Sequence, residues 1–247
     1  MKRLIHSLSL ALLAGVLMAA AGAVANDEKV IRAAFIEFPP LATRNDNGQP
    51  EGSFIRMTEQ VAQRAGYSIQ WQELPIGRVY LYLEQGEIDL WPGSAGVPEL
   101  AGFTRETPFS AGSIQLNAYS RNDTGAIESL EELRGKRLIL IRGYTYFRLL
   151  DELKADPDTY VTIAPDHASA IRMLAFRRGD YLINFQAPMD ATLARTPLPG
   201  LVQTNLLSWP LGFIFSTAAP GTETMIREFS RAWSELQAEG MAGLSDG

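Results

Sequence analysis

The chain has 247 residues, of which 46% are hydrophobic and 20% are charged, and its formal net charge is −6 at pH 7. This surplus of acidic residues gives no support for nucleic-acid binding, which depends on basic patches. With no Cys and only two His, the chain cannot form disulfides and is not expected to hold zinc. We expect neither a metal nor a cofactor.

The N-terminus has the pattern of a secretory signal peptide. Lys2 and Arg3 precede an almost wholly apolar or small run over residues 4–23, and residues 23–25 (Ala-Val-Ala) form a cleavage site. The alternative is an uncleaved membrane anchor, although one His and two Ser interrupt the run. We therefore expect residues 1–25 to be cleaved near Ala25 and the mature protein to be free in the periplasm. Its 222 residues carry 20 Lys and Arg against 28 Asp and Glu, a formal charge of −8.

The first half of the mature chain alternates strand and helix patterns. The predicted elements are a strand at 30–36, a turn-rich loop at 43–52, a helix at 54–65, a strand at 67–72, a helix at 76–85, a strand at 88–91 and a crossover strand at 114–119. Residues 92–96 (Pro-Gly-Ser-Ala-Gly) are predicted to form a flexible loop whose backbone amides can approach a ligand.

The second half repeats this pattern. Ser129 and Glu132 have the spacing of a capping box and predict a short helix. The elements predicted after it are strands at 138–141, 160–163 and 181–185, helices at 147–153 and 168–176, a returning strand at 206–216, and a final amphipathic helix with its apolar stripe at 225–236.

Two helix-to-strand passages, at residues 81–90 and 173–183, are similar to each other. Each ends an apolar-periodic helix at a Gly, passes an Asp, and enters a short apolar run typical of a buried parallel strand. The two acids, Asp89 and Asp180, are expected to be structural turn and cap residues. The repeat predicts an α/β fold of two similar lobes joined by a two-strand hinge, with a ligand cleft between them. We place lobe one at residues 26–117 and 206–247, and lobe two at 118–205.

A series of short motifs runs through nearly all of the mature chain. They are residues 38–40 (Phe-Pro-Pro), 47–48 (Asn-Gly) with Gly52, 74–78 (Leu-Pro-Ile-Gly-Arg), 86–89 (Gly-Glu-Ile-Asp), 108–110 (Pro-Phe-Ser) and 129–136 (Ser-Leu-Glu-Glu-Leu-Arg-Gly-Lys). Their order and spacing resemble the periplasmic solute-binding proteins of the amino-acid-binding type, family 3. This resemblance implies the type II bilobed fold of ABC-importer receptors.

Two ligand motifs of that family are missing here. Its amino-acid binders carry a Thr-Pro-Glu-Arg stretch whose Arg pairs with the ligand's α-carboxylate. In this chain residues 97–100 are Val-Pro-Glu-Leu, so Leu100 stands in place of the Arg. In lobe two the family often has an Asp for the ligand's ammonium, but residues 184–186 are Asn-Phe-Gln. The departures imply a ligand other than an ordinary α-amino acid.

Ligand-binding candidates are sought beside the carboxyl ends of the predicted strands and at helix starts. The ten candidates are Glu37, Phe38, Arg78, Trp91, Ser94, Arg142, Tyr144, Thr145, Asn184 and Gln186.

Several of these residues have a second interpretation. Arg78 could bind a carboxylate or be an ordinary surface residue at a helix start, and Arg142 could bind an anion or bridge the lobes. Trp91 could stack on a ligand or fill the core. Glu37 could pair with a ligand ammonium or be a solvated loop carboxylate. His167, which the candidates omit, is expected to be a solvated residue at a helix start.

These observations predict a monomeric periplasmic receptor, not an enzyme, that closes its lobes on a small polar ligand. Its expected partners are a permease of an ABC importer or a sensor ectodomain. Two alternatives remain: a stand-alone sensory module, and an enzyme on the same fold similar to cyclohexadienyl dehydratase, with Glu37 as its acid or base. If the ligand is an anion, Arg142→Ala is predicted to weaken binding at least about tenfold.

Overall fold

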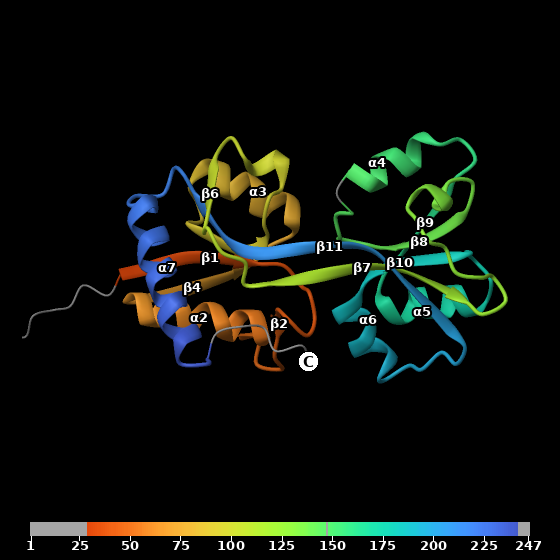
Figure 1. Ribbon diagram of the computed structural model, residues 1–247, viewed down its shortest axis with the longest axis horizontal. Coiled ribbons are helices and arrows are strands. Elements are labelled where there is room, and N and C mark those ends of the chain that lie inside the picture. Colours follow the sequence, from red (N-terminus) through yellow and green to blue (C-terminus); the bar gives the residue numbers. More distant parts are fainter. Residues whose placement is uncertain (1–28, 147, 242–247) are drawn as a thin grey trace, which may run out of the picture.

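The computed structural model describes residues 29–146 and 148–241. The predicted signal peptide and its cleavage site lie outside these residues. None of the helices in the described part of the chain is long and apolar enough to cross a membrane. Two α/β lobes lie side by side, and two long strands run through both of them (Figure 1).

Nine strands of the described chain form one mixed sheet that continues from one lobe into the other. Its order is β4-β1-β5-β11-β7-β10-β8-β9, with β6 paired to β11, while β2 and β3 form a separate hairpin. The strands are β1 Lys29–Phe35, β2 Thr43–Arg44, β3 Pro50–Glu51, β4 Tyr67–Glu73, β5 Leu90–Ser94, β6 Thr104–Glu106, β7 Gly112–Arg121, β8 Arg137–Ile141, β9 Tyr160–Ala164, β10 Tyr181–Phe185 and β11 Leu201–Ser216. The α-helices are α2 Ser53–Ala65, α3 Ile76–Gln85, α4 Arg148–Ala155, α5 His167–Ala175, α6 Gln186–Leu193 and α7 Thr222–Ala238.

Lobe one consists of β1 to β6, α2, α3, α7 and the C-terminal part of β11 (Figure 1). Strand β1 lies between β4 and β5 and is parallel to both. Successive residues of β11 point to opposite faces of the sheet. Phe213 and Phe215 therefore join the apolar cluster of α2 and α7, whereas Ile214 joins that of α3. Both faces of the sheet are thereby buried.

Lobe two consists of β8 to β10, α4 to α6, and the adjoining parts of β7 and β11. Strand β8 lies between β10 and β9 and is parallel to both. Ile139 and Leu182 pack with α5 and α6 on one face of the sheet. On the other face Leu153 of α4 belongs to the same apolar cluster as Leu138.

Strands β7 and β11 connect the lobes. They pair antiparallel from Gly112 and Leu211 to Arg121 and Leu201, with a register shift between Asn205 and Leu207 of β11. Both strands are longer than predicted, because this pairing continues through alternating polar residues. The expected fold of two α/β lobes joined by a two-strand hinge is confirmed.

Each lobe contains the same ion pair beside its repeated helix-to-strand passage. In lobe one the Asp89 carboxylate accepts hydrogen bonds from the Arg32 backbone amide at 2.9 Å and from its guanidinium at 2.5 and 3.1 Å. In lobe two Asp180 accepts from the Arg137 amide at 3.0 Å and from its guanidinium at 2.6 and 3.2 Å. The Arg137 hydrogen bonds hold the pKa of Asp180 below its usual value. Both acids are therefore structural, as predicted, but each binds a strand arginine instead of acting as a turn or cap residue.

Two local predictions are wrong. The flexible loop expected at 92–96 is largely strand, since β5 continues to Ser94 and pairs with β11 through Gly93 and Pro92. The short helix expected after Ser129 is present as a three-residue 3₁₀ helix, Glu131–Leu133, but its capping box does not form. The Glu132 carboxylate there accepts from the Glu128 amide at 3.2 Å and from the Ser129 hydroxyl at 3.4 Å. The Ser129 hydroxyl therefore meets a carboxylate instead of capping a backbone amide.

Candidate ligand-binding cavity

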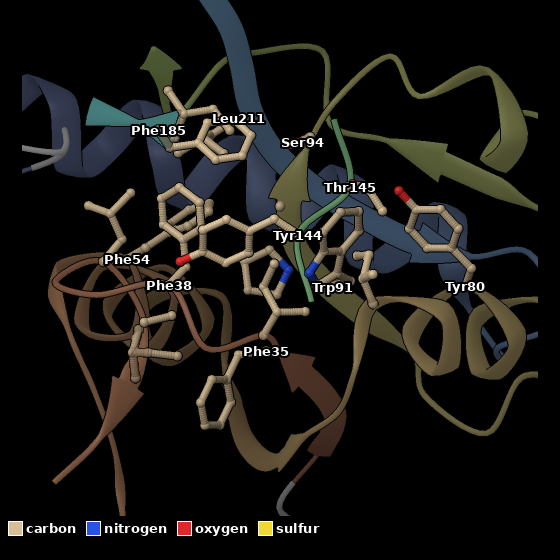
Figure 2. A pocket seen from close by; sticks show the side chains of 18 residues that line it. Phe35, Phe38, Phe54, Tyr80, Trp91, Ser94, Tyr144, Thr145, Phe185 and Leu211 are labelled. Carbon is tan, nitrogen blue, oxygen red and sulfur yellow. The ribbon is translucent and has the colours of Figure 1, made fainter. Parts of the chain in front are cut away.

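A cavity lies between the lobes, beside the ends of β1 and β5 (Figure 2). The empty space within it, part of which is open to solvent, is about 690 Å³. The 18 lining residues are Phe35, Ile36, Phe38, Leu41, Ala42, Phe54, Ile55, Ile76, Tyr80, Trp91, Pro92, Gly93, Ser94, Ile114, Tyr144, Thr145, Phe185 and Leu211.

Lobe one supplies most of the wall. The carboxyl ends of the parallel strands β1 and β5 meet at the same edge of the sheet, where open α/β folds place their ligands. Phe35 ends β1, and residues 91–94 belong to β5. Helices α2 and α3 begin at this edge and add Phe54 and Tyr80. The periodic apolar residues of these elements thus serve both the core and the cavity.

Trp91 owes its position to Gly93. A Cβ atom on Gly93 would lie 2.2 Å from two carbons of the indole, so the ring packs directly on the glycine backbone. The indole also meets the Tyr80 ring edge-on, with centroids 5.8 Å apart and planes at 61°. Trp91 is 3% exposed and belongs to the lobe-one core as well as to the cavity wall. The core and ligand interpretations of this residue are therefore compatible.

Phe38 makes contact across the cleft. It lies in the tight turn after β1, where its amide donates to the Ala42 carbonyl at 2.7 Å. Its ring centroid lies 5.4 Å from that of Tyr144 and 5.2 Å from that of Phe185, both in lobe two. Aromatic pairs at these separations attract each other beyond the effect of buried area. The rings hold the two lobes together at this side of the cavity.

A second contact between the lobes joins Tyr80 and Thr145. Burial and, to a smaller extent, the negative charge of Glu99 together raise the pKa of the Tyr80 phenol to about 12, against the opposite effect of a side-chain hydrogen bond with Thr145. Figure 2 shows the two side chains facing each other at one end of the cavity. Tyr80 is therefore a neutral hydroxyl at neutral pH.

Tyr144 enters the cavity wall from lobe two. Its hydroxyl lies 3.1 Å from Nε2 of His167, and Nδ1 of that imidazole lies 2.9 Å from the Asn184 amide nitrogen. Burial raises the pKa of Tyr144 and lowers that of His167. His167 is only partly exposed. The prediction of a solvated histidine is therefore wrong, because the loop after β8 folds Tyr144 over the start of α5.

The lining carries no charged side chain among the residues that the structure describes. Its polar side-chain groups are the hydroxyls of Ser94, Thr145, Tyr80 and Tyr144 and the Trp91 indole N–H. Burying an ion without a partner is costly, whereas aromatic and aliphatic walls stabilise apolar surface. The cavity is chemically suited to a neutral and largely apolar molecule.

Half of the predicted site residues line this cavity, and half do not. Those in the lining are Phe38, Trp91, Ser94, Tyr144 and Thr145. Those outside it are Glu37, Arg78, Arg142, Asn184 and Gln186.

The candidates outside the lining have other surroundings. Glu37 is exposed and accepts a hydrogen bond from the Thr43 hydroxyl at 2.6 Å. Arg78 and Arg142 are both exposed. Asn184 is fully buried behind Tyr144 and His167. The charged candidates therefore lie outside the cavity wall and are exposed.

The sequence interpretation missed most of the apolar lining. Phe54, Tyr80 and Leu211 have the helical or strand spacing of core residues. The available signal was the position of Phe54 and Tyr80 in the first half of their helices, since these helices follow strands whose carboxyl ends border the cleft.

Comparisons with known proteins agree with this architecture. The family model for bacterial extracellular solute-binding proteins, family 3, matches residues 31–240. The probable amino-acid-binding protein YxeM of Bacillus subtilis (strain 168) is 22% identical over 158 residues, which cover 62% of this chain and 58% of that relative. The match thus spans less than two thirds of the relative's length.

Solved structures share the fold. A histidine kinase sensor domain with similarity to periplasmic binding proteins superposes with a TM-score of 0.71 at 21% identity, covering 86% of this chain and 91% of the other. An ancestral arginine-binding protein bound to arginine gives 0.69 at 19% identity, covering 87% and 95%. Because the family model spans both lobes and the hinge, this chain belongs to the bacterial extracellular solute-binding proteins of family 3.

Proposed function

We propose that the protein is a periplasmic receptor that closes on an uncharged, largely apolar or aromatic small molecule. The observation that carries this proposal is the absence of any charged side chain among the described residues of the cavity wall. This ligand differs from the small polar solute expected from the sequence. Closure would be driven by contacts that the ligand makes with both lobes at once.

The place of the missing family arginine supports this ligand class. Leu100 is fully buried and packs with Val97 and Trp91 in the lobe-one core. The side chain that replaces the carboxylate-binding Arg therefore stabilises the wall behind Trp91. An amino-acid ligand would place its carboxylate against apolar groups at a large desolvation cost.

We propose that a membrane protein recognises and binds the closed form of the receptor. Membership of the family supports an importer permease as the partner. The likeness to a histidine kinase sensor domain supports a sensor instead. Neighbouring genes for a permease and an ATPase would favour the importer.

An enzymatic role is the weaker alternative. The sequence nominates Glu37 as acid or base, but this exposed carboxylate accepts from Thr43 and lies outside the lining. Turnover of prephenate or arogenate by the purified protein would support the enzyme instead.

The test is thermal unfolding of residues 26–247, refolded to remove copurified solute. The panel compares neutral aromatics such as indole and acetophenone with arginine, glutamate and polyamines. A ligand present at about 100 times its Kd adds about 2.7 kcal/mol of stability, which corresponds to a shift of roughly 5–10 °C at this size. Shifts with neutral aromatics alone are expected. A shift with a charged amino acid and none with any aromatic would overturn the proposed ligand class.

A further inference from the structure

A hydrogen-bonded chain of three side chains leads from the interior of lobe two to the cavity. Asn184 is the penultimate residue of β10, His167 begins α5, and Tyr144 lies in the loop after β8. Of the three, only Tyr144 belongs to the lining. What these three side chains can do depends on which of their atoms donate hydrogen bonds and which accept them.

The Asn184 amide has a defined orientation. Its Oδ1 accepts the hydrogen bond of the Phe185 backbone amide at 2.9 Å. A backbone N–H can only donate, so the oxygen of the amide must be on that side. The nitrogen of Asn184 is therefore the atom that faces Nδ1 of His167 at 2.9 Å.

This orientation determines the tautomer of His167. Because the Asn184 nitrogen donates, Nδ1 must accept and Nε2 must carry the proton of the neutral imidazole. Burial lowers the pKa of His167, while the adjacent Asp166 raises it to a smaller extent. The protonated Nε2 then donates to the Tyr144 oxygen at 3.1 Å.

The Tyr144 hydroxyl thus accepts from His167 and keeps its own proton available. Within the described residues it has no other hydrogen-bond partner. Figure 2 shows the Tyr144 ring in the cavity wall with its hydroxyl extending toward Phe38 of lobe one. A buried donor in this largely apolar wall selects for an acceptor, because an unpaired buried donor costs more than a hydrogen bond gains.

We infer that Asn184 and His167 are positioning residues that make Tyr144 a hydrogen-bond donor to the ligand, which therefore carries an uncharged acceptor such as a carbonyl or ether oxygen. This inference rests on the proposed function and adds a specific polar group to its ligand. The acceptor is uncharged because the described wall holds no cation to pair with an anionic oxygen.

The hydrogen bonds that link Asn184, His167 and Tyr144 are sensitive to the protonation of His167. A proton on Nδ1 would set two donors against each other at the Asn184 contact. The other titratable groups recorded around the chain are Asp166 beside His167, and Glu37 and Tyr146 beside Tyr144. Hydrogen bonds from Ser169 lower the pKa of Asp166, and burial raises that of Tyr146, so preference for the acceptor should decline below neutral pH through His167.

The experiment compares pairs of probes that differ at one position. Acetophenone and α-methylstyrene differ by oxygen against CH₂, and indole-3-carbaldehyde and 3-methylindole differ by an aldehyde against a methyl group. Their Kd values are measured on residues 26–247 by titration calorimetry, with the wild type and the variants Tyr144→Phe, His167→Ala and His167→Gln. Thermal unfolding without ligand checks that each variant is folded.

The carbonyl probe is expected to bind about three- to tenfold more tightly than its hydrocarbon partner. Tyr144→Phe and His167→Ala should abolish this preference, whereas His167→Gln, which retains a donor near Nε2, should keep it. The preference should fall from pH 8 to pH 5 in the wild type but not in His167→Gln.

Equal affinities within each pair, or a preference that survives Tyr144→Phe, would overturn this inference and leave the apolar ligand class intact. If none of the four probes binds, the apolar ligand site itself is refuted. The isosteric Tyr144→Phe variant keeps the ring contacts, so the test does not depend on the stability of the histidine variants.

Discussion

The two lobes share one scaffold but contribute unequally to the cavity. Thirteen of the 18 lining residues come from lobe one, three from lobe two, and two from the crossing strands. Lobe one forms a concave apolar surface at the ends of β1 and β5. Lobe two adds Tyr144, Thr145 and Phe185, which close this surface from the other side.

This difference indicates a division of labour. The lobe with most of the wall should supply most of the apolar binding energy, because that energy scales with buried area. The lobe with few contacts should govern closure and selectivity, since its hydroxyls and rings are engaged only when the lobes meet. Paired substitutions in the two lobes can break or sharpen this comparison.

The largest difference between the lobes is expected in the stability that each one gains from its Arg–Asp ion pair. The Asp89 side chain is 10% exposed and that of Asp180 is 25% exposed. Asp89→Ala should lower the free energy of unfolding by about 3 kcal/mol, because it leaves the Arg32 amide and guanidinium without their partner. Asp180→Ala should cost only about 1 kcal/mol, since water solvates Arg137 more fully.

Urea denaturation measures both losses. Asp46→Ala, an exposed substitution in lobe one, is the control and should stay within about 0.5 kcal/mol of the wild type. Equal losses of unfolding free energy in the two variants would show that the difference in burial between the two ion pairs has no effect on stability.

The next difference concerns two glycines. Gly93→Ala forces the Trp91 indole away and should cost about 2 kcal/mol of stability and at least about tenfold in affinity for a neutral aromatic. In lobe two a Cβ on Gly179 would lie 2.6 Å from Cγ1 of the fully buried Ile139 and 3.2 Å from the Arg137 carbonyl oxygen. Gly179→Ala should therefore also cost about 2 kcal/mol of stability, but it should leave affinity unchanged because neither Gly179 nor Ile139 lines the cavity.

Calorimetry and denaturation on the same samples separate the two effects. Gly77→Ala in α3 meets no atom within 4 Å and should be neutral or slightly stabilising. Loss of affinity in the Gly179 variant as great as in the Gly93 variant would contradict the dominance of lobe one.

These two comparisons also mark what could be read from the sequence. Asp89 and Asp180 were predictable because a helix stop, an acid and an apolar strand are local features. Tyr144 was predictable because it follows a strand that ends at the cleft. Phe54 and Leu211 were not, because apolar spacing is the same whether a side chain faces the core or a cavity, and only the approach of the second lobe distinguishes the two.

The charged residues predicted to bind ligand lie outside the lining for a related reason. The position of a long side chain after a strand is local information, but its direction is set by solvation and neighbouring charges. The importance of His167 depended on Asn184, 17 residues away, and on the orientation of that amide. No spacing rule reveals such a contact.

A smaller effect is expected from pH, and it should come from lobe two. His167 is the one His after the predicted signal peptide, and burial lowers its pKa below the ordinary value of 6.5. As pH falls below 6.5 the unfolded chain binds a proton before the folded one does, so stability should decline toward the lowered pKa. The loss should be at most about 1 kcal/mol, because the ring is partly solvated.

Denaturation at pH 7.5, 6.5, 5.5 and 5.0 checks this decline against His167→Gln, which should remove most of it. Carboxylates such as Asp180, whose pKa is lowered from 3.8, lose their stabilising effect only at more acidic pH. An unchanged slope in His167→Gln would assign the decline to other groups.

The smallest effect is expected from the two exposed arginines, one in each lobe. Arg78 and Arg142 both lie outside the lining. Arg78→Ala and Arg142→Ala should therefore change the Kd for indole by less than about twofold, in contrast to the tenfold loss that the sequence predicts for Arg142 with an anionic ligand. A tenfold loss in either variant would mean that an arginine turns into the cleft when a ligand is bound. Because indole carries no charge, the lobe that carries that arginine would then contribute to the cavity by stacking its guanidinium on the aromatic ring.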